Sequence, residues 1–89
     1  MIEICEVGPR DGLQTEKTSL STANKIMLIQ KLIDSGIKKI EVTSFVNPKI
    51  VPQMSDAKQL IKELPIVEDV IYTGLLLSRS GLERALTTN

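Results

Sequence analysis

The most informative stretch of this 89-residue chain is Glu6–Thr15, with the sequence E-V-G-P-R-D-G-L-Q-T. With the apolar run that precedes it, it predicts a strand over Ile2–Val7 that ends in a Gly-Pro turn. The turn presents Arg10 and Asp11 side by side. Charged, glycine-flanked loops after buried strands are how α/β folds place chemistry at the carboxyl edge of a parallel sheet. A carboxylate can hold a divalent metal and a guanidinium can neutralise an oxyanion, so this pair forms a candidate site.

The composition argues against several classes of protein. Eleven basic residues balance eleven acidic ones, which does not favour a nucleic-acid partner, because such a protein needs a basic surface. Apolar residues make up 42% of the chain and only two residues are aromatic, so we expect a packed, aliphatic core. No stretch approaches the roughly 18 apolar residues that span a membrane. Cys5 is the only cysteine, which suits a reducing cytoplasm, and we expect it to be a small core residue.

Strand and helix patterns alternate along the rest of the chain, with no linker, so residues 1–89 form one domain at most. The expected elements are a helix from Ser21 to about Ser35, a strand over Lys39–Ser44, a helix capped by Ser55 and closed by Pro65, a strand over Val70–Thr73, and a helix with a capping box of Ser80 and Glu83. This β-α-β-α-β-α order has the period of βα units and predicts a parallel sheet. Composition alone cannot choose between a doubly wound sheet and a barrel.

Apolar residues at helical spacing indicate which helix faces pack inward. We expect Gly36 to end the first helix in a left-handed conformation, with Ile37 as its hydrophobic partner. The expected buried positions are Ala23, Ile26, Ile29, Leu32 and Ile33 in the first helix, Leu60, Ile61 and Leu64 in the second, and Leu82, Ala85 and Leu86 in the third.

Two segments carry a family resemblance. Residues 6–14 read E-V-G-P-R-D-G-L-Q, and residues 41–54 read E-V-T-S-F-V-N-P-K-I-V-P-Q-M. Together they closely resemble the N-terminal part of the 3-hydroxy-3-methylglutaryl-CoA lyases, which are metal-dependent TIM-barrel enzymes. The first segment is also similar to a wider group of barrel enzymes that includes isopropylmalate and homocitrate synthases, whereas the second points to the lyases. The match runs in register from Ile2 to about Ala85.

The resemblance implies a role for four residues. Arg10 would be catalytic and substrate-binding, stabilising the enolate that cleavage leaves behind. Asp11 would be a ligand of a divalent metal, Mg²⁺ or Mn²⁺, whose other ligands, a His-x-His pair and an asparagine, lie outside this chain. Gln14 would line the substrate pocket. Glu41 would lie in the barrel interior near the site and act in catalysis.

The resemblance also implies an activity and an architecture. The reaction would cleave an acyl-CoA substrate to acetyl-CoA and acetoacetate, as in leucine degradation, in a homo-oligomer, most simply a dimer. A complete barrel needs about 250 residues, so this chain corresponds to about three of the eight units of a TIM (β/α)8 barrel. We therefore expect an N-terminal piece of a longer enzyme that is inactive alone.

Several alternatives stay open from the sequence. The Gly-Pro turn could be only a solvated turn, and Glu41 could face solvent or pair structurally with Lys39. The parent could instead be a condensing enzyme similar to isopropylmalate synthase, or the chain could be a non-catalytic fragment that self-associates. One stretch departs from the lyase pattern, because Leu77-Ser78 stands where the lyases usually carry Pro-Asn.

Overall fold

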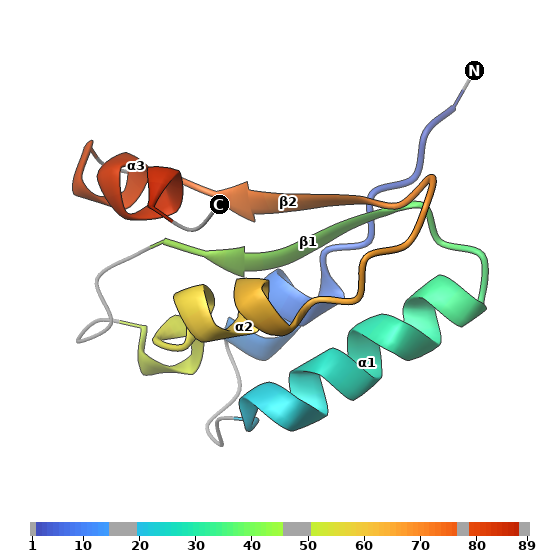
Figure 1. The fold of residues 1–89 in the computed structure, drawn as a ribbon, viewed down its shortest axis with the longest axis horizontal. Helices are drawn as coiled ribbons and strands as arrows, with labels where there is room; N and C mark the ends of the chain where they lie inside the picture. The colour runs from blue at the N-terminus through green and yellow to red at the C-terminus, as the bar shows by residue number, and fades with distance from the viewer. Residues whose placement is uncertain (1, 15–19, 46–50, 77–78, 88–89) are drawn as a thin grey trace.

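The computed structural model describes residues 2–14, 20–45, 51–76 and 79–87. Within these ranges the chain forms two strands and three α-helices, arranged as in Figure 1. A π-helical turn at Gly8–Gly12 and a short 3-10 helix at Pro52–Met54 follow the first predicted strand and β1 respectively. The elements are α1 (Thr22–Asp34), β1 (Lys39–Ser44), α2 (Ala57–Glu63), β2 (Ile71–Leu75) and α3 (Arg79–Leu86).

The two strands pair in parallel, with Lys39 opposite Ile71 and a bulge between Glu41 and Thr43. The segment before them lies on the other side of β1, because Glu6 forms a parallel bridge with Ile40. The three βα units therefore lie side by side in chain order, as in the wall of a barrel. The predicted strand Lys39–Ser44 is confirmed, and the strand predicted over Val70–Thr73 begins one residue later and ends two residues later.

The strand predicted over Ile2–Val7 is wrong except at Glu6. Residues 2–5 adopt no regular structure, and Ile2 and Ile4 are 91% and 67% exposed. Cys5 is also exposed, which contradicts its assignment to the core. A strand of a parallel sheet is buried only where neighbouring strands and helices cover it, and no described segment covers these residues.

Helices α1 and α2 pack against one face of the sheet. Ile40 and Val42 of β1 form a buried cluster with Ile29 of α1 and Leu60 of α2. Because successive side chains of a strand point to opposite faces, Glu41 lies on the face away from these helices. The two long layers of Figure 1, strands above and helices below, correspond to this arrangement.

The ends of α1 follow the sequence prediction. Ser21 caps the helix, since its Oγ accepts a hydrogen bond of 3.1 Å from the Asn24 amide. Gly36 has a φ of +96°. Its amide donates to the Ile33 carbonyl, and the Ile37 amide donates to the Leu32 carbonyl, which together make a Schellman motif.

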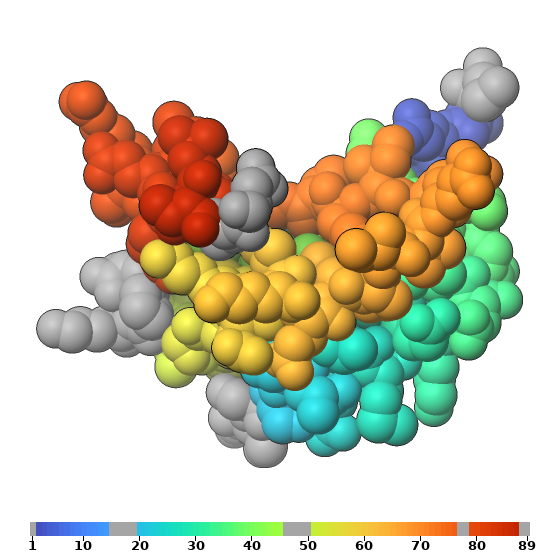
Figure 2. All heavy atoms as spheres, in the orientation of Figure 1, coloured from blue at the N-terminus to red at the C-terminus, as the bar shows by residue number. Residues whose placement is uncertain are grey.

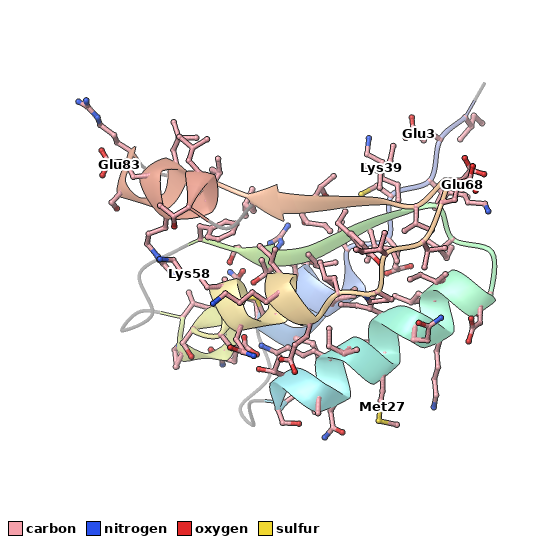
Figure 3. The ribbon with its side chains drawn as sticks, viewed as in Figure 1. Glu3, Met27, Lys39, Lys58, Glu68 and Glu83 are labelled. Carbon is pink, nitrogen blue, oxygen red and sulfur yellow. The ribbon has the colours of Figure 1, made fainter. Side chains whose placement is uncertain are left out.

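The predicted apolar face of α1 is correct except at one position. Ile29 is fully buried and Ile26, Leu32 and Ile33 pack against the cluster, but Ala23 is exposed. Lys25 is buried in its place, because its ammonium group has oxygen partners in the segment before α2. Met27 points away from the sheet (Figure 3).

Two helix starts differ from the prediction. The residue before α2 is Asp56 rather than Ser55, and α3 already includes Ser80, so neither serine caps its helix. Pro65 closes the second helix as expected, because Leu64 before it is already extended. Leu82 and Leu86 are exposed, since α3 lies beyond the carboxyl end of β2 (Figure 1), and its atoms, red in Figure 2, stand out at one side of the molecule. The departure at Leu77-Ser78 lies outside the described residues.

Candidate active site

The turn that carries the candidate site is held by its own backbone and by Glu6. The amides of Arg10 and Asp11 both donate to the Val7 carbonyl, at 3.1 and 2.6 Å. The Gly8 amide donates to Glu6 Oε1 at 2.9 Å. A Cβ atom at Gly8 would lie only 3.0 Å from that oxygen, so glycine allows the carboxylate to approach the backbone. Single π-helical turns of this kind are frequent at functional sites.

Arg10 and Glu41 form the centre of the site. Glu41 Oε2 lies 2.8 Å from both Nε and Nη2 of Arg10. The two side chains are only 16% and 15% exposed, so water screens this ion pair weakly. The pair joins the turn after the first segment to the face of β1 away from the helices, where Glu41 is directed by strand alternation.

Asp11 lies at the outer side of the same arginine. Its Oδ1 is 3.2 Å from Arg10 Nη1, and its side chain is 63% exposed. The guanidinium of Arg10 is therefore held between two carboxylates. An exposed carboxylate is the type of ligand that Mg²⁺ and Mn²⁺ prefer, so Asp11 fits a role as one ligand. The part of the chain that the structure describes holds no group of three or more metal-binding side chains.

Gln14 follows three residues after Asp11 and is half-buried. Its Oε1 is buried and has no hydrogen-bond partner among the described residues. The structure thus brings Arg10 into direct contact with both Asp11 and Glu41, and Gln14, three residues after Asp11 in the chain, keeps a buried acceptor without a partner among the described residues. A buried acceptor without a donor is unfavourable, so this oxygen is a candidate contact for a bound molecule.

Sequence reasoning missed three features of the site. Glu6 stabilises the turn by accepting a hydrogen bond from the Gly8 amide. Arg10, rather than Lys39, is the partner of Glu41. Lys39 instead lies 3.3 Å from Glu3, and the two side chains are close together in Figure 3. The alternation of side chains over residues 39–42 and the side-by-side packing of consecutive βα units were the signals that could have paired Glu41 with Arg10.

Phe45, which belongs to the second motif, has a packing role. It is buried, and a Cβ atom at Gly74 of β2 would come within 3.1 Å of its ring. Its amide donates to the Leu75 carbonyl at 3.0 Å. Phe45 therefore packs the carboxyl ends of β1 and β2 against each other. Residues 46–50 of the same motif lie outside the described residues.

Neighbouring parallel strands, helices on one face and a charged pair on the other face are the arrangement found in the wall of a βα-barrel, and they define the class of the fold. A family model described as HMGL-like matches residues 1–89, and the chain belongs to this family. The family resemblance drawn from the two motifs is therefore confirmed. Among the described residues, none of the helices is both long and apolar enough to cross a membrane.

Individual relatives agree with the family assignment. The chain is 43% identical over 84 residues to a hydroxymethylglutaryl-CoA lyase of Pseudomonas mevalonii, covering 94% of this chain and 28% of that protein. It is 46% identical over 85 residues to the mitochondrial hydroxymethylglutaryl-CoA lyase of Homo sapiens, covering 96% of this chain and 26% of that protein.

A solved structure shows the same fold. An HMG-CoA lyase from Acinetobacter baumannii, in complex with coenzyme A and 3-methylmalate, superimposes with a TM-score of 0.92 at 39% identity. The match covers 100% of this chain and 29% of that one. The fold is therefore the N-terminal βαβαβα portion of a TIM barrel, and the chain spans less than a third of the length of these relatives.

Proposed function

We propose that this chain is the N-terminal part of a longer, metal-dependent lyase that cleaves 3-hydroxy-3-methylglutaryl-CoA to acetyl-CoA and acetoacetate. The observation that carries the proposal is the Arg10–Glu41 pair, which lies on the sheet face away from the helices in a chain belonging to the HMGL-like family. On this proposal, the described residues supply one side of the active site, and the chain alone is inactive.

The proposed role of Arg10 is to stabilise the negative charge that develops during cleavage. When the carbon–carbon bond breaks, its electron pair moves toward the thioester, and negative charge develops on the thioester oxygen. A guanidinium held in advance at that oxygen stabilises the charge without reorganising at the moment of reaction. Glu41 holds the guanidinium of Arg10 in this position, since it binds Nε and Nη2 and leaves Nη1 directed toward Asp11.

Asp11 would hold the divalent metal together with ligands from the rest of the polypeptide. When bound, the metal supplies Lewis-acid chemistry that lowers the pKa of the substrate hydroxyl. The exposed carboxylate of Asp11 suits this role. Arg10 Nη1 donates a hydrogen bond to Asp11 Oδ1, and this contact would keep the metal ligand beside the arginine, so that the hydroxyl and the thioester of one substrate would be bound at adjacent positions.

Gln14 would bind the substrate through its buried Oε1, which lacks a donor among the described residues. A substrate hydroxyl or amide N–H in this position would satisfy it. A Gln14→Leu variant would keep the volume of the side chain and remove that acceptor.

Two further parts of the proposal concern the cell and the assembly. We place the full-length enzyme in the cytoplasm, as the single cysteine within residues 1–89 suits a reducing compartment, and we expect a homodimer. The human relative is called mitochondrial, so fractionation of the source cells is the direct test of the location. Size-exclusion chromatography with light scattering tests the dimer.

The activity is tested with the full-length polypeptide and 3-hydroxy-3-methylglutaryl-CoA. Acetoacetate release should require Mg²⁺ or Mn²⁺ and should stop when EDTA is added. Asp11→Ala should lower activity at saturating substrate and raise the metal concentration needed for half-maximal rate. Full activity of Asp11→Ala at the same metal concentration would exclude the metal role, and absence of cleavage by the wild-type protein would exclude the proposed reaction.

A further inference from the structure

A second ion pair joins the first two βα units. Lys25 Nζ lies 2.6 Å from Asp56 Oδ1, and it also donates to the Gln53 carbonyl at 2.5 Å. The second carboxylate oxygen of Asp56 accepts a hydrogen bond of 2.5 Å from the Thr22 hydroxyl. Lys25 is only 2% exposed, so its ammonium group depends on these oxygens in place of water.

The two ion pairs have the same spacing along the chain. Arg10 and Glu41 are 31 residues apart, and so are Lys25 and Asp56. In each pair the cation belongs to the first βα unit and the carboxylate to the second. One pair joins the turn after the first segment to the middle of β1, and the other joins the two units where their helices begin, at the carboxyl end of β1 (Figure 1).

Asp56 serves the contact between units rather than its own helix. It stands immediately before α2, where an aspartate usually caps the helix, but its side chain makes no capping hydrogen bond. Both of its oxygens instead bind side chains of α1. The side chain of Asp56 therefore connects α1 to the start of α2 and does not stabilise α2 by capping it.

We propose that Lys25, Thr22 and Asp56 are positioning residues for the candidate active site; this inference rests on the proposed lyase function. Thr22 is the first residue of α1, the helix that follows the turn carrying Arg10, and Asp56 immediately precedes α2, the helix that follows β1 and Glu41. Fixing the starts of these two helices to each other limits how far the turn and β1, and hence the arginine, can shift relative to one another. Small displacements of a catalytic group cost large factors in rate.

The decisive variant removes both charges and keeps the volume. Replacing a buried ion pair by apolar residues of similar size is often neutral for stability, whereas removing one partner is not. Lys25→Met combined with Asp56→Leu is therefore compared with the wild-type full-length protein. Lys31→Met is the matched control, because it makes the same substitution on the exposed side of the same helix.

The readout is kcat and KM for 3-hydroxy-3-methylglutaryl-CoA at a temperature where circular dichroism shows every variant folded. We expect the double variant to lose at least about tenfold in kcat with little change in KM, and Lys31→Met to match the wild type. A folded double variant with wild-type kcat would overturn the proposal. If the double variant does not fold, Thr22→Val replaces it: a kcat about threefold lower supports the proposal, and an unchanged kcat refutes it.

Hydrogen exchange separates this inference from the proposed reaction. The amides of Arg10 and Asp11 are bonded to Val7 and do not take part in the second ion pair. In the double variant, or in Thr22→Val if that variant is used, they should exchange at least about tenfold faster than in the wild type. If the wild type does not cleave the substrate, the lyase proposal fails, and this measurement alone decides whether the pair positions the turn; unchanged protection means that it does not.

Discussion

Glu41 Oε2 lies 2.8 Å from two nitrogens of Arg10, although the residues are 31 positions apart and belong to different βα units. A carboxylate that contacts Nε and Nη2 fixes the plane of the guanidinium as well as its location. The third nitrogen, Nη1, then reaches Asp11 at 3.2 Å. One glutamate thereby sets the orientation of both groups to which we assign chemistry.

Replacing Glu41 by Gln should lower kcat by about tenfold to a hundredfold, because the amide loses the charge that orients Arg10. KM should change much less, since Arg10 itself remains. Steady-state kinetics of the full-length protein measure both values. Glu3→Gln is the control, as Glu3 pairs with Lys39 and is mainly exposed. Equal rates for Glu41→Gln and Glu3→Gln would contradict the orienting role.

Replacing Arg10 by Lys should lower kcat by about a hundredfold to a thousandfold, the loss seen when one donor to a developing oxyanion is removed. Lysine keeps the positive charge but cannot contact Glu41 through two nitrogens in a plane while reaching Asp11 with a third. The prediction separates geometry from charge. A lysine variant within about threefold of the wild type would mean that any nearby cation suffices, and that Glu41 does not act through orientation.

Replacing Gly36 by Ala should destabilise the fold by about 1–2 kcal/mol, because its φ of +96° is unfavourable for any residue with a Cβ atom. Among the described residues, no heavy atom beyond Gly36 and its two chain neighbours lies within 4 Å of the position where that Cβ would stand, so the cost comes from the local backbone and not from tertiary contacts. Chemical denaturation measures it. Gly12→Ala is the control for stability, since Gly12 also has open space around it but no positive φ. Equal stability of the two variants would argue against a strained backbone at Gly36.

Local signals in the sequence predicted the parts of the fold that depend on local chemistry. The Ser21 cap, the Gly36 ending and the stop at Pro65 each involve residues close together in the chain, and each was correct. The Ser55 cap failed for a non-local reason, because Lys25 and Thr22 of another element draw the neighbouring Asp56 toward α1. Helix-capping preferences consider only residues near in the chain, so they cannot predict that side chains of another helix bind Asp56.

The same distinction applies to the site. Arg10 and Asp11 are neighbours in the chain, so their proximity was evident from the sequence. The partner of Glu41 was not, because Lys39 stands two residues away on the same face of β1, whereas Arg10 reaches it only once the units pack side by side. The buried Lys25 was missed because only apolar residues were assigned to the inward face of α1.

The tyrosine at position 72 should make stability depend on pH in the alkaline range. Burial raises the pKa of the Tyr72 phenol above its ordinary value of 10.0, and its hydroxyl donates to the Pro65 carbonyl. The unfolded chain therefore releases this proton at lower pH than the folded chain does. The contribution of Tyr72 is complete below pH 10 and is lost as the pH rises through the folded-state pKa, so the free energy of unfolding should fall there.

Tyr72→Phe should remove this part of the pH dependence. At neutral pH the variant should be less stable by about 1 kcal/mol, because the Pro65 carbonyl loses its donor while the ring keeps its packing. Urea denaturation at several pH values between neutral and alkaline, for the wild type and the variant, gives the difference in unfolding free energy. That difference should shrink with increasing pH above 10, since other titrating groups are common to both proteins. A difference that stays constant or grows would show that the folded state does not hold the phenol in its neutral form.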